Sequence, residues 1–455
     1  MEESAYTKKI TIRRKKYRSF LGLCLALCGL AVSLVWQQCI VRRIPESILL
    51  YQNEEQRIDF GIPVSADISI SGLQETEQKM EPAEVTDDFV LSWKKWDERG
   101  RDTISTPVTQ TLAMKGSSGR QYQMGLKLYG VVPVKSVSVK VISPQSLYLS
   151  GEPVGIYLKT KGVLVIDTGS FPSVGQTDHS PAHEILQSGD YILKVGGKEI
   201  SSKKDLIAEI NQCDGRELVF TILRNGEISE VALTPEKDVA GTYKAGIWVR
   251  DSAQGIGTVT YLTEEGNFGA LGHGINDSDT ATLMHLGKGS IYATSILSIS
   301  RGETDHPGQL TGILTFEKND YLGKIEQNSD VGIFGRLESE KKVLTRLTED
   351  MILCPVALKQ EVKKGKAQIY CDIDGEPDFY DIEIEQLYFD GGHDNQGILL
   401  TVTDERLLSV TGGIVQGMSG SPIIQNGKII GAVTHVFVKD ATKGYGVFIE
   451  KMLEH

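Results

Sequence analysis

The hexapeptide "GMSGSP" at residues 417–422 places two serines in a glycine-rich frame. A serine hydroxyl is a weak nucleophile until a neighbouring base removes its proton, and the oxyanion that forms next needs backbone N–H donors. Ser419 occupies the G-x-S-G frame, and the amides of Gly417 and Ser419 are predicted to form an oxyanion hole. Ser421 precedes Pro422 and an apolar strand pattern, so we interpret it as structural. Because glycine and serine also gather in ordinary turns, the motif needs a base and an acid elsewhere in the chain.

The predicted base is His273, which lies between two glycines in "GALGHGI", shortly after a strand pattern. His393, in the turn-like text "FDGGHDN", is the competing candidate. His435 lies inside the apolar run "GAVTHVFV" and is expected to be a core residue. His179 and His183 belong to an earlier, separate unit and are set aside.

An acid that orients the base is the third requirement of this chemistry. Asp404 ends the strand pattern "GILLTVTD" and comes 15 residues before Ser419, which makes it the predicted acid. Asp390 and Asp394 are alternatives, and any of the three is also a candidate for capping a turn.

Composition limits the classes of function. The 455-residue chain is long enough for two or three domains, and its 48 glycines with many short Val, Ile, Thr and Tyr runs favour β structure. A net charge of −12 argues against nucleic acid as the main partner, since phosphate binding needs concentrated Lys and Arg. The sequence has no CxxC or HExxH pattern that would indicate a zinc site, and no cofactor is implied.

The N-terminus has a different character from the rest. Residues 8–18 carry seven basic residues and no acidic one, and residues 19–36 are uncharged. Eighteen residues of helix span roughly 27 Å, near the lower limit for crossing a bilayer. We predict a cytoplasmic tail over 1–18 and a membrane anchor over 19–38, which places the remaining chain outside the cytoplasm. A cleavable signal peptide is the alternative.

The segment from 39 to 120 is mixed in composition and is interpreted as a stalk with a few strands such as "ADISISG". Cys354 and Cys371 end two strand-like runs, so the sequence allows a disulfide between them without requiring it.

Residues 121–236 are predicted to contain a β-rich lead-in and an α+β domain. The run "GVLVID" predicts a buried strand, residues 180–190 predict a short helix, and "SSKKDLIAEINQ" predicts an amphipathic helix with a capping box. A hairpin is predicted to turn at Arg224-Asn225-Gly226. The text "PAHEILQSGDYILKVGGKEI" resembles a bacterial PDZ domain, a class that binds extended peptides by strand addition.

Beyond residue 240 the chain has many short strand patterns, as a sandwich or closed barrel would. Together with the PDZ-like unit, "GALGHGI" and "TGGIVQGMSGSPIIQNGKIIGAVTHV" closely resemble the stage IV sporulation protein B peptidases of endospore-forming bacteria. That resemblance implies a mainly β chain whose residues 240–455 form a chymotrypsin-like double β-barrel serine protease. It implies His273 as base, Asp404 as acid and Ser419 as nucleophile.

The same resemblance implies a signalling endopeptidase of sporulation. It is expected to act between the two membranes around the forespore and to cleave itself near its N-terminal side. Its protein substrate would be the regulator of an intramembrane protease, and cleavage would activate a late mother-cell sigma factor. A catalytically silent, membrane-tethered PDZ receptor and a PDZ-containing quality-control protease are the alternatives. In the quality-control enzymes the PDZ domain normally follows the protease domain, whereas here it precedes it.

Overall fold

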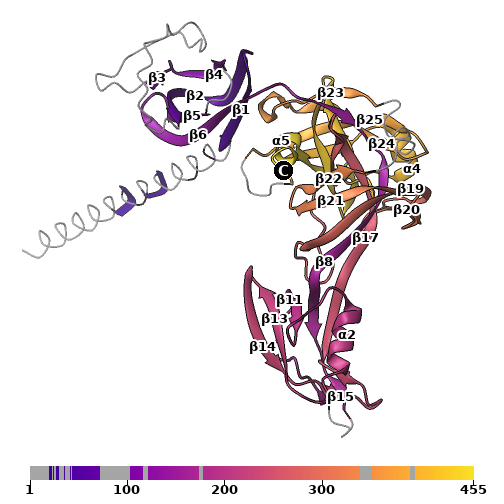
Figure 1. Cartoon of the computed structure of the whole chain (residues 1–455). Helices are drawn as coiled ribbons and strands as arrows, with labels where there is room; N and C mark the ends of the chain where they lie inside the picture. The colour runs from indigo at the N-terminus through magenta and orange to yellow at the C-terminus, as the bar shows by residue number, and fades with distance from the viewer. Residues whose placement is uncertain are drawn as a thin grey trace, which may run out of the picture. The chain divides into compact units, whose positions relative to one another are not determined.

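The computed structural model describes residues 44–71, 103–115, 121–173, 178–338, 351–389 and 395–455, with scattered residues between 20 and 41 (Figure 1). The chain divides into two compact units, of which the first is residues 1–144 with 388–392 and the second is the remainder. Most of the predicted anchor at 19–38 lies outside the described residues. Within the described part, no helix is both long and apolar enough to cross a membrane.

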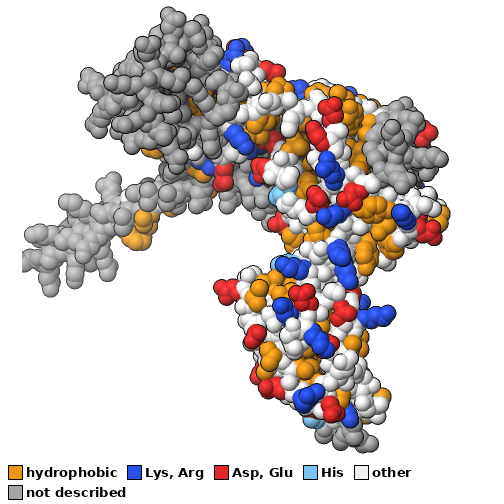
Figure 2. Space-filling view, viewed as in Figure 1, with side chains coloured by type: hydrophobic (Ala, Val, Ile, Leu, Met, Phe, Trp, Pro, Cys, Tyr) orange, Lys and Arg blue, Asp and Glu red, His pale blue; other side chains and the backbone are white. Residues whose placement is uncertain are grey.

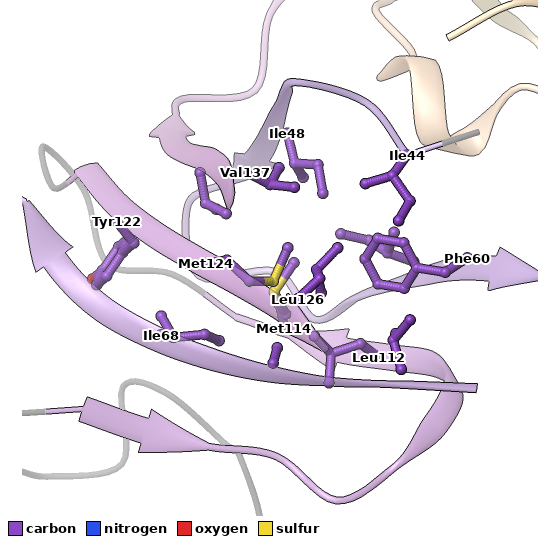
Figure 3. Close-up of a cluster of buried hydrophobic side chains, with 14 of the residues drawn as sticks. Ile44, Ile48, Phe60, Ile68, Leu112, Met114, Tyr122, Met124, Leu126 and Val137 are labelled. Carbon is purple, nitrogen blue, oxygen red and sulfur yellow. The ribbon is translucent and has the colours of Figure 1, made fainter. Parts of the chain in front are cut away.

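The first unit is a six-stranded sheet in the order β1-β6-β5-β2-β3, with β4 also paired to β2. Its strands are β1 (Ser47–Tyr51), β2 (Gln56–Ser71), β3 (Thr103–Ser105), β4 (Thr109–Met114), β5 (Gln121–Leu128) and β6 (Val132–Ile142). One face carries its own apolar core, which includes Phe60, Leu112, Met114 and Met124 (Figure 3).

The stalk predicted for residues 39–120 is therefore wrong, because most of the described part of that segment is packed sheet. The boundary predicted at 120/121 falls inside the sheet, since β2 pairs with β5 in register from Val64 with Leu128 to Ser71 with Gln121. β1 pairs in parallel with β6, about 90 residues further along the chain. Such distant pairings leave no local signal in the sequence.

The second unit begins with a long ladder between two strands, β8 (Pro153–Thr168) and β17 (Ile247–Leu262). These strands pair antiparallel from Ile247 with Thr168 to Thr258 with Pro153. At one end they join the PDZ sheet with β11, β13 and β14, and at the other they enter the peptidase region (Figure 1).

The PDZ region lies in sequence between β8 and β17. Its elements are β9 (Phe171–Pro172), β10 (Asp178–His179), β11 (Tyr191–Val195), β12 (Lys198–Glu199), α2 (Lys203–Asn211), β13 (Leu218–Arg224), β14 (Glu227–Leu233), β15 (Glu236–Lys237) and β16 (Tyr243–Lys244).

The Ser202 cap of α2 is confirmed, as is the hairpin turn, where Asn225 and Gly226 have φ of 51° and 82°. The helix predicted at 180–190 is wrong: the segment forms turns, and Glu184 has a left-handed φ of 64° that interrupts a helical path.

Six strands of the peptidase region pair in a ring, β8-β19-β21-β22-β18-β17, which the β8–β17 ladder closes. All six contribute buried side chains to one core, among them Ile156, Val259, Phe268 and Ile291. The further elements here are β7 (Ser146–Leu149), β18 (Asn267–Ala270), β19 (Leu286–Ser300), β20 (Gln309–Leu314), β21 (Tyr321–Ser329), β22 (Gly332–Leu337) and β23 (Leu353–Pro355).

The C-terminal part is a closed barrel in the order β24-β25-β26-β29-β28-β27. Its elements are η1 (Lys359–Glu361), β24 (Gly365–Asp372), β25 (Pro377–Leu387), β26 (Ile398–Val402), α4 (Glu405–Thr411), β27 (Pro422–Gln425), β28 (Lys428–Phe437), β29 (Asp440–Phe448) and α5 (Ile449–Met452). Cys354 and Cys371 are both buried as free thiols, so the structure does not join them. On the face drawn in Figure 2, basic and acidic side chains are interspersed over the PDZ and peptidase regions.

The separate core of the first unit leads to a stability prediction. Met124→Ala removes a fully buried side chain from that core and should destabilise the first unit by about 2–5 kcal/mol. Because none of the cores of the second unit includes these residues, the melting of the peptidase region should not change. Differential scanning calorimetry of the full chain checks this, with Val132→Ala at an exposed position of the same sheet as control. A uniform shift of all transitions by Met124→Ala would contradict the prediction.

Candidate active site

Ser419 lies in a loop that is held between the ring and the closed barrel. Thr258 of β17 donates its N–H to the Ser419 carbonyl at 2.9 Å and its hydroxyl to the Gly417 carbonyl at 2.7 Å. On the other side, the Gly420 N–H donates to the carbonyl of Val433 in β28 at 2.8 Å. Gly420 has a φ of 101°, and a Cβ there would lie 2.0 Å from the Thr258 carbonyl oxygen. A side chain at 420 would therefore push the loop away from β17.

Two backbone amides in this loop are available as donors. Within the described residues, the N–H groups of Gly417 and Ser419 have no hydrogen-bond acceptor in the protein. Buried N–H groups are rarely left unpaired, and free donors beside a nucleophile are what an oxyanion hole requires. The geometry is compatible with the predicted role of Gly417 and Ser419.

His273 follows β18, where the chain turns through two residues with left-handed backbone, Leu271 and Gly272. A Cβ at Gly272 would lie 2.9 Å from the Thr434 side chain of β28, so glycine allows the ring to approach the closed barrel here. The turn brings His273 into a cavity of about 500 Å³ that Ser419 also lines. The structure thus brings the predicted base and the predicted nucleophile to one site.

The tautomer of His273 follows from its hydrogen bond. Nδ1 lies 2.9 Å from the Gly274 carbonyl oxygen, which can only accept, so Nδ1 must carry the proton. Nε2 is then unprotonated and able to act as a base. Burial lowers the pKa of His273, and the bond to Gly274 offsets only part of this effect.

The hydroxyl of Ser419 donates to the Thr434 carbonyl at 2.7 Å in this structure. To react with His273 as base, the side chain must rotate from this carbonyl towards the imidazole. Such catalytic hydrogen bonds often form only when substrate is bound. Ser421 is fully buried, and its hydroxyl donates to the Met418 carbonyl at 2.7 Å, as expected of a structural serine.

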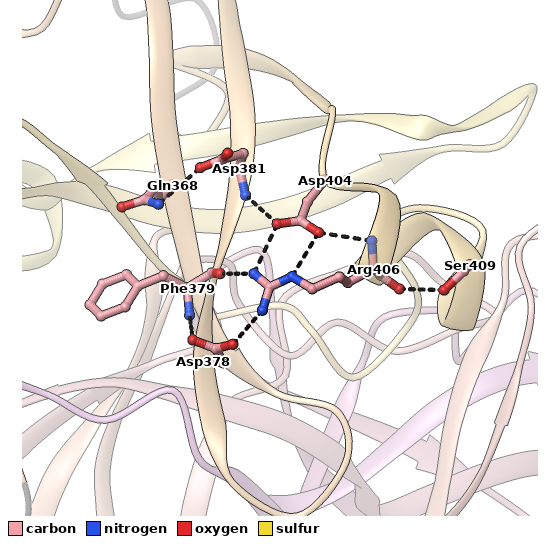
Figure 4. Close-up of polar contacts among 7 residues, drawn as sticks. All are labelled: Gln368, Asp378, Phe379, Asp381, Asp404, Arg406 and Ser409. Atoms are coloured by element: carbon pink, nitrogen blue, oxygen red, sulfur yellow. Dashed lines mark hydrogen bonds and ion pairs between the residues drawn. The ribbon is translucent and has the colours of Figure 1, made fainter.

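Asp404 lies elsewhere, at the start of α4 (Figure 4). Its carboxylate accepts hydrogen bonds from the Arg406 side chain at 3.0 and 3.2 Å, and from the backbone N–H groups of Arg406 and Asp381. Burial alone would raise the pKa of Asp404, but these hydrogen bonds lower it. Asp404 does not line the cavity, and no bond to His273 is present in the described residues. Its role as acid stays a prediction; Asp390 and Asp394, like His393, lie outside the described residues.

The prediction that His435 is a core residue is wrong. It was expected in the core, but it is exposed and lines the same cavity, with its ring centroid 4.9 Å from that of His273. The pKa of His435 is lowered, first because neighbouring atoms remove part of the ring from water, and second because a charged His273 would repel its proton. The apolar run around it concealed this, since β28 is buried on both faces from Ile429 to Thr434 and opens only at His435.

Comparisons with known proteins match two regions of this chain. Residues 241–453 match the family SpoIVB peptidase S55, and residues 137–234 match the PDZ domain. The chain is 28% identical over 175 residues to a protein of Treponema pallidum (strain Nichols) named "Putative zinc metalloprotease", a match covering 35% of this chain and 39% of that protein. The chain thus spans about two fifths of that relative. In the described residues, no three His, Cys, Asp or Glu side chains are grouped so as to hold a metal ion.

The fold and the family matches define a serine peptidase that carries a PDZ domain. More particularly, residues 241–453 match the SpoIVB peptidase S55 family, in agreement with the resemblance seen in the sequence.

The lowered pKa of His273 predicts the acid limb of the pH profile. A base is active above its pKa, so kcat/KM should stay high down to a pH below 6.5, the ordinary value for histidine, and should fall as His273 becomes protonated. Hydrolysis of a peptide substrate measured from pH 4 to 8 checks this. The limb should persist in His435→Gln, and its disappearance in that variant would assign the titration to His435 instead.

Proposed function

We propose that this chain is a membrane-anchored signalling serine endopeptidase that uses Ser419 as nucleophile and His273 as base. The observation that carries the proposal is the cavity that His273 and Ser419 share. Among the described residues, nothing bonds to Nε2 of His273, and the N–H groups of Gly417 and Ser419 have no acceptor. We also propose that the six-stranded ring and the closed barrel are the two barrels of a chymotrypsin-like fold.

In the proposed reaction, the Ser419 Oγ attacks the carbonyl carbon of a peptide bond while Nε2 of His273 takes the hydroxyl proton. The N–H groups of Gly417 and Ser419 stabilise the oxyanion, and His273 then returns the proton to the leaving amine. The Gly274 carbonyl holds the imidazole in the required tautomer, a task that an acid performs in other serine peptidases. Water hydrolyses the acyl-enzyme in the reverse sequence of proton transfers.

The chemistry of the cavity indicates the kind of substrate. Among the described residues that line it, the two histidines are the only ionisable side chains, and most of the others are aliphatic, such as Ile256, Ile275, Ile414, Val415 and Val436. Transfer of apolar surface from water favours binding here, so we propose cleavage beside an apolar residue.

We propose a place for this activity in sporulation, with support from the family match and the PDZ domain. The enzyme would be held by an N-terminal segment in the cell membrane, with its N-terminus in the cytoplasm and the peptidase in the space between the forespore membranes. It would cleave its own N-terminal region and then the regulator of an intramembrane protease, which activates a late mother-cell sigma factor.

A serine-reactive fluorophosphonate tests the enzyme against the alternative of a silent PDZ receptor. The wild type should be labelled, Ser419→Ala should not, and Ser421→Ala should be labelled whenever it folds. Turnover of Ser419→Ala should fall by roughly 10⁶-fold, as removal of a nucleophile does elsewhere. Near-normal cleavage by Ser419→Ala, or a folded wild type without labelling, would end the proposal.

Variants of Asp404 and Arg406 test whether Asp404 is the acid of a catalytic triad. In this structure Asp404 caps α4 and pairs with Arg406, so Asp404→Asn and Arg406→Gln should lower the melting temperature and kcat/KM by similar amounts. Kinetics and thermal melts of both variants check this. A loss of about 10⁴-fold in kcat confined to Asp404→Asn would instead establish Asp404 as the acid of a triad.

A further inference from the structure

One strand, β17, takes part in both the PDZ domain and the catalytic cavity. Residues 247–250 pair with the PDZ part of β8, and Ala253, Gln254, Gly255 and Ile256 line the cavity of Ser419. Over this whole stretch β8 occupies one edge of β17. In the described residues no strand pairs with the opposite edge before Val259, where β18 begins to pair.

The free edge of β17 begins directly beside the nucleophile. Thr258 points its N–H to the Ser419 carbonyl and its C=O to the Leu271 N–H, so both groups of Thr258 lie on the edge away from β8. Because backbone groups alternate between the two edges of a strand, the N–H and C=O of Ile256 and Gln254 point to the same edge. These two residues are the next hydrogen-bonding positions for a polypeptide that leaves the catalytic serine.

Further along β17, α2 contacts this strand at Asp251. The Lys203 N–H donates to the Asp251 carboxylate at 2.9 Å, and the Lys203 ammonium lies 3.4 Å from it, so this face of α2 is turned to β17. Ile207 is one turn further along that face and is 57% exposed, while Leu206 and Ile210 are buried in the PDZ core. Ile247 and Val249 of β17 pack against that core. The exposed Ile207 is thus an apolar side chain on the helix that contacts β17, and strand addition combines backbone pairing with such apolar contacts.

We propose that the free edge of β17 guides a single extended substrate segment from the exposed Ile207 of the PDZ region to Ser419. The segment would run antiparallel to β17, as all the strands already paired with β17 do. From Ile247 to Ile256 a strand covers roughly 30 Å at about 3.3 Å per residue, so the PDZ-bound residues lie about ten residues from the scissile bond. The PDZ domain then selects the peptide bond that is cut as well as the protein that is bound. The β8–β17 register shifts near Asp251, where the guided segment must bend.

The partner that fits this surface is an unfolded protein segment, because a folded one cannot present about ten extended residues to a strand edge. This proposal rests on the proposed peptidase function and adds a substrate class and a spacing rule to it.

The test uses the full chain and a library of randomised peptides of about 25 residues, long enough to reach both sites. Mass spectrometry maps each cleaved bond relative to the apolar residues of the peptide. For the wild type, cleaved bonds should lie at a preferred spacing of about ten residues from an apolar anchor. In Ile207→Asp the preferred spacing should disappear, and kcat/KM for the long peptides should fall roughly tenfold or more, since tethering raises the effective concentration of the bond. Cleavage of peptides too short to reach α2 should not change.

Ile228→Asp is the matched control, because Ile228 is an equally apolar residue, 69% exposed, on β14 of the same domain. The control should keep the wild-type spacing. Active wild type with no preferred spacing, or with the same profile in Ile207→Asp, would overturn the guiding role while leaving the peptidase intact. Cleavage that persists in Ser419→Ala would instead refute the peptidase assignment itself.

Discussion

The β8–β17 ladder is the interaction on which the rest of the second unit depends. Both strands are 16 residues long, and each has one end in the PDZ sheet and the other in the six-stranded ring. Because backbone hydrogen bonds continue along most of this length, the two regions are joined by a structural element instead of a loop. Thr258, near the end of the ladder, also holds the loop of Ser419 through two hydrogen bonds. The loop of Ser419, the proposed nucleophile, is therefore held in part by the strand that the PDZ region shares.

The groups of the proposed active site differ in how closely their present hydrogen bonds match the arrangement that the reaction needs. The proposed base, His273, is prepared, because the Gly274 carbonyl fixes the proton on Nδ1 and burial disfavours the charged ring. The donors for the oxyanion have no acceptor in the described protein. The proposed nucleophile, Ser419, donates its hydroxyl to the Thr434 carbonyl instead of to His273. In the proposed mechanism a bound substrate would displace this hydroxyl from the Thr434 carbonyl and leave it available to His273.

Sequence patterns predicted those features whose causes are local. Gly417, Ser419 and Ser421 could be given roles because the motif itself contains the glycines that allow the loop geometry. The Asn225-Gly226 turn was predictable for the same reason. Features caused by distant partners were missed. The sheet of the first unit depends on pairings such as Ser71 with Gln121, and His435 is exposed because β28 reaches the cavity at that residue. The Asp404 carboxylate is hydrogen-bonded to the Arg406 side chain, and the spacing of the two residues along the chain does not reveal this contact.

The PDZ region interrupts the peptidase, since the ring takes β8 from one side of it and β17 from the other. Family matches divide the chain between residues 234 and 241, yet a fragment that starts at 241 would lack β8. β17 and β19 would then each lose a neighbour, and buried residues of β8 such as Val154 and Ile156 would leave a gap in the ring core. A truncation that removes β8 together with the PDZ region therefore also opens the peptidase ring, so the two regions cannot be separated at the boundary between the family matches.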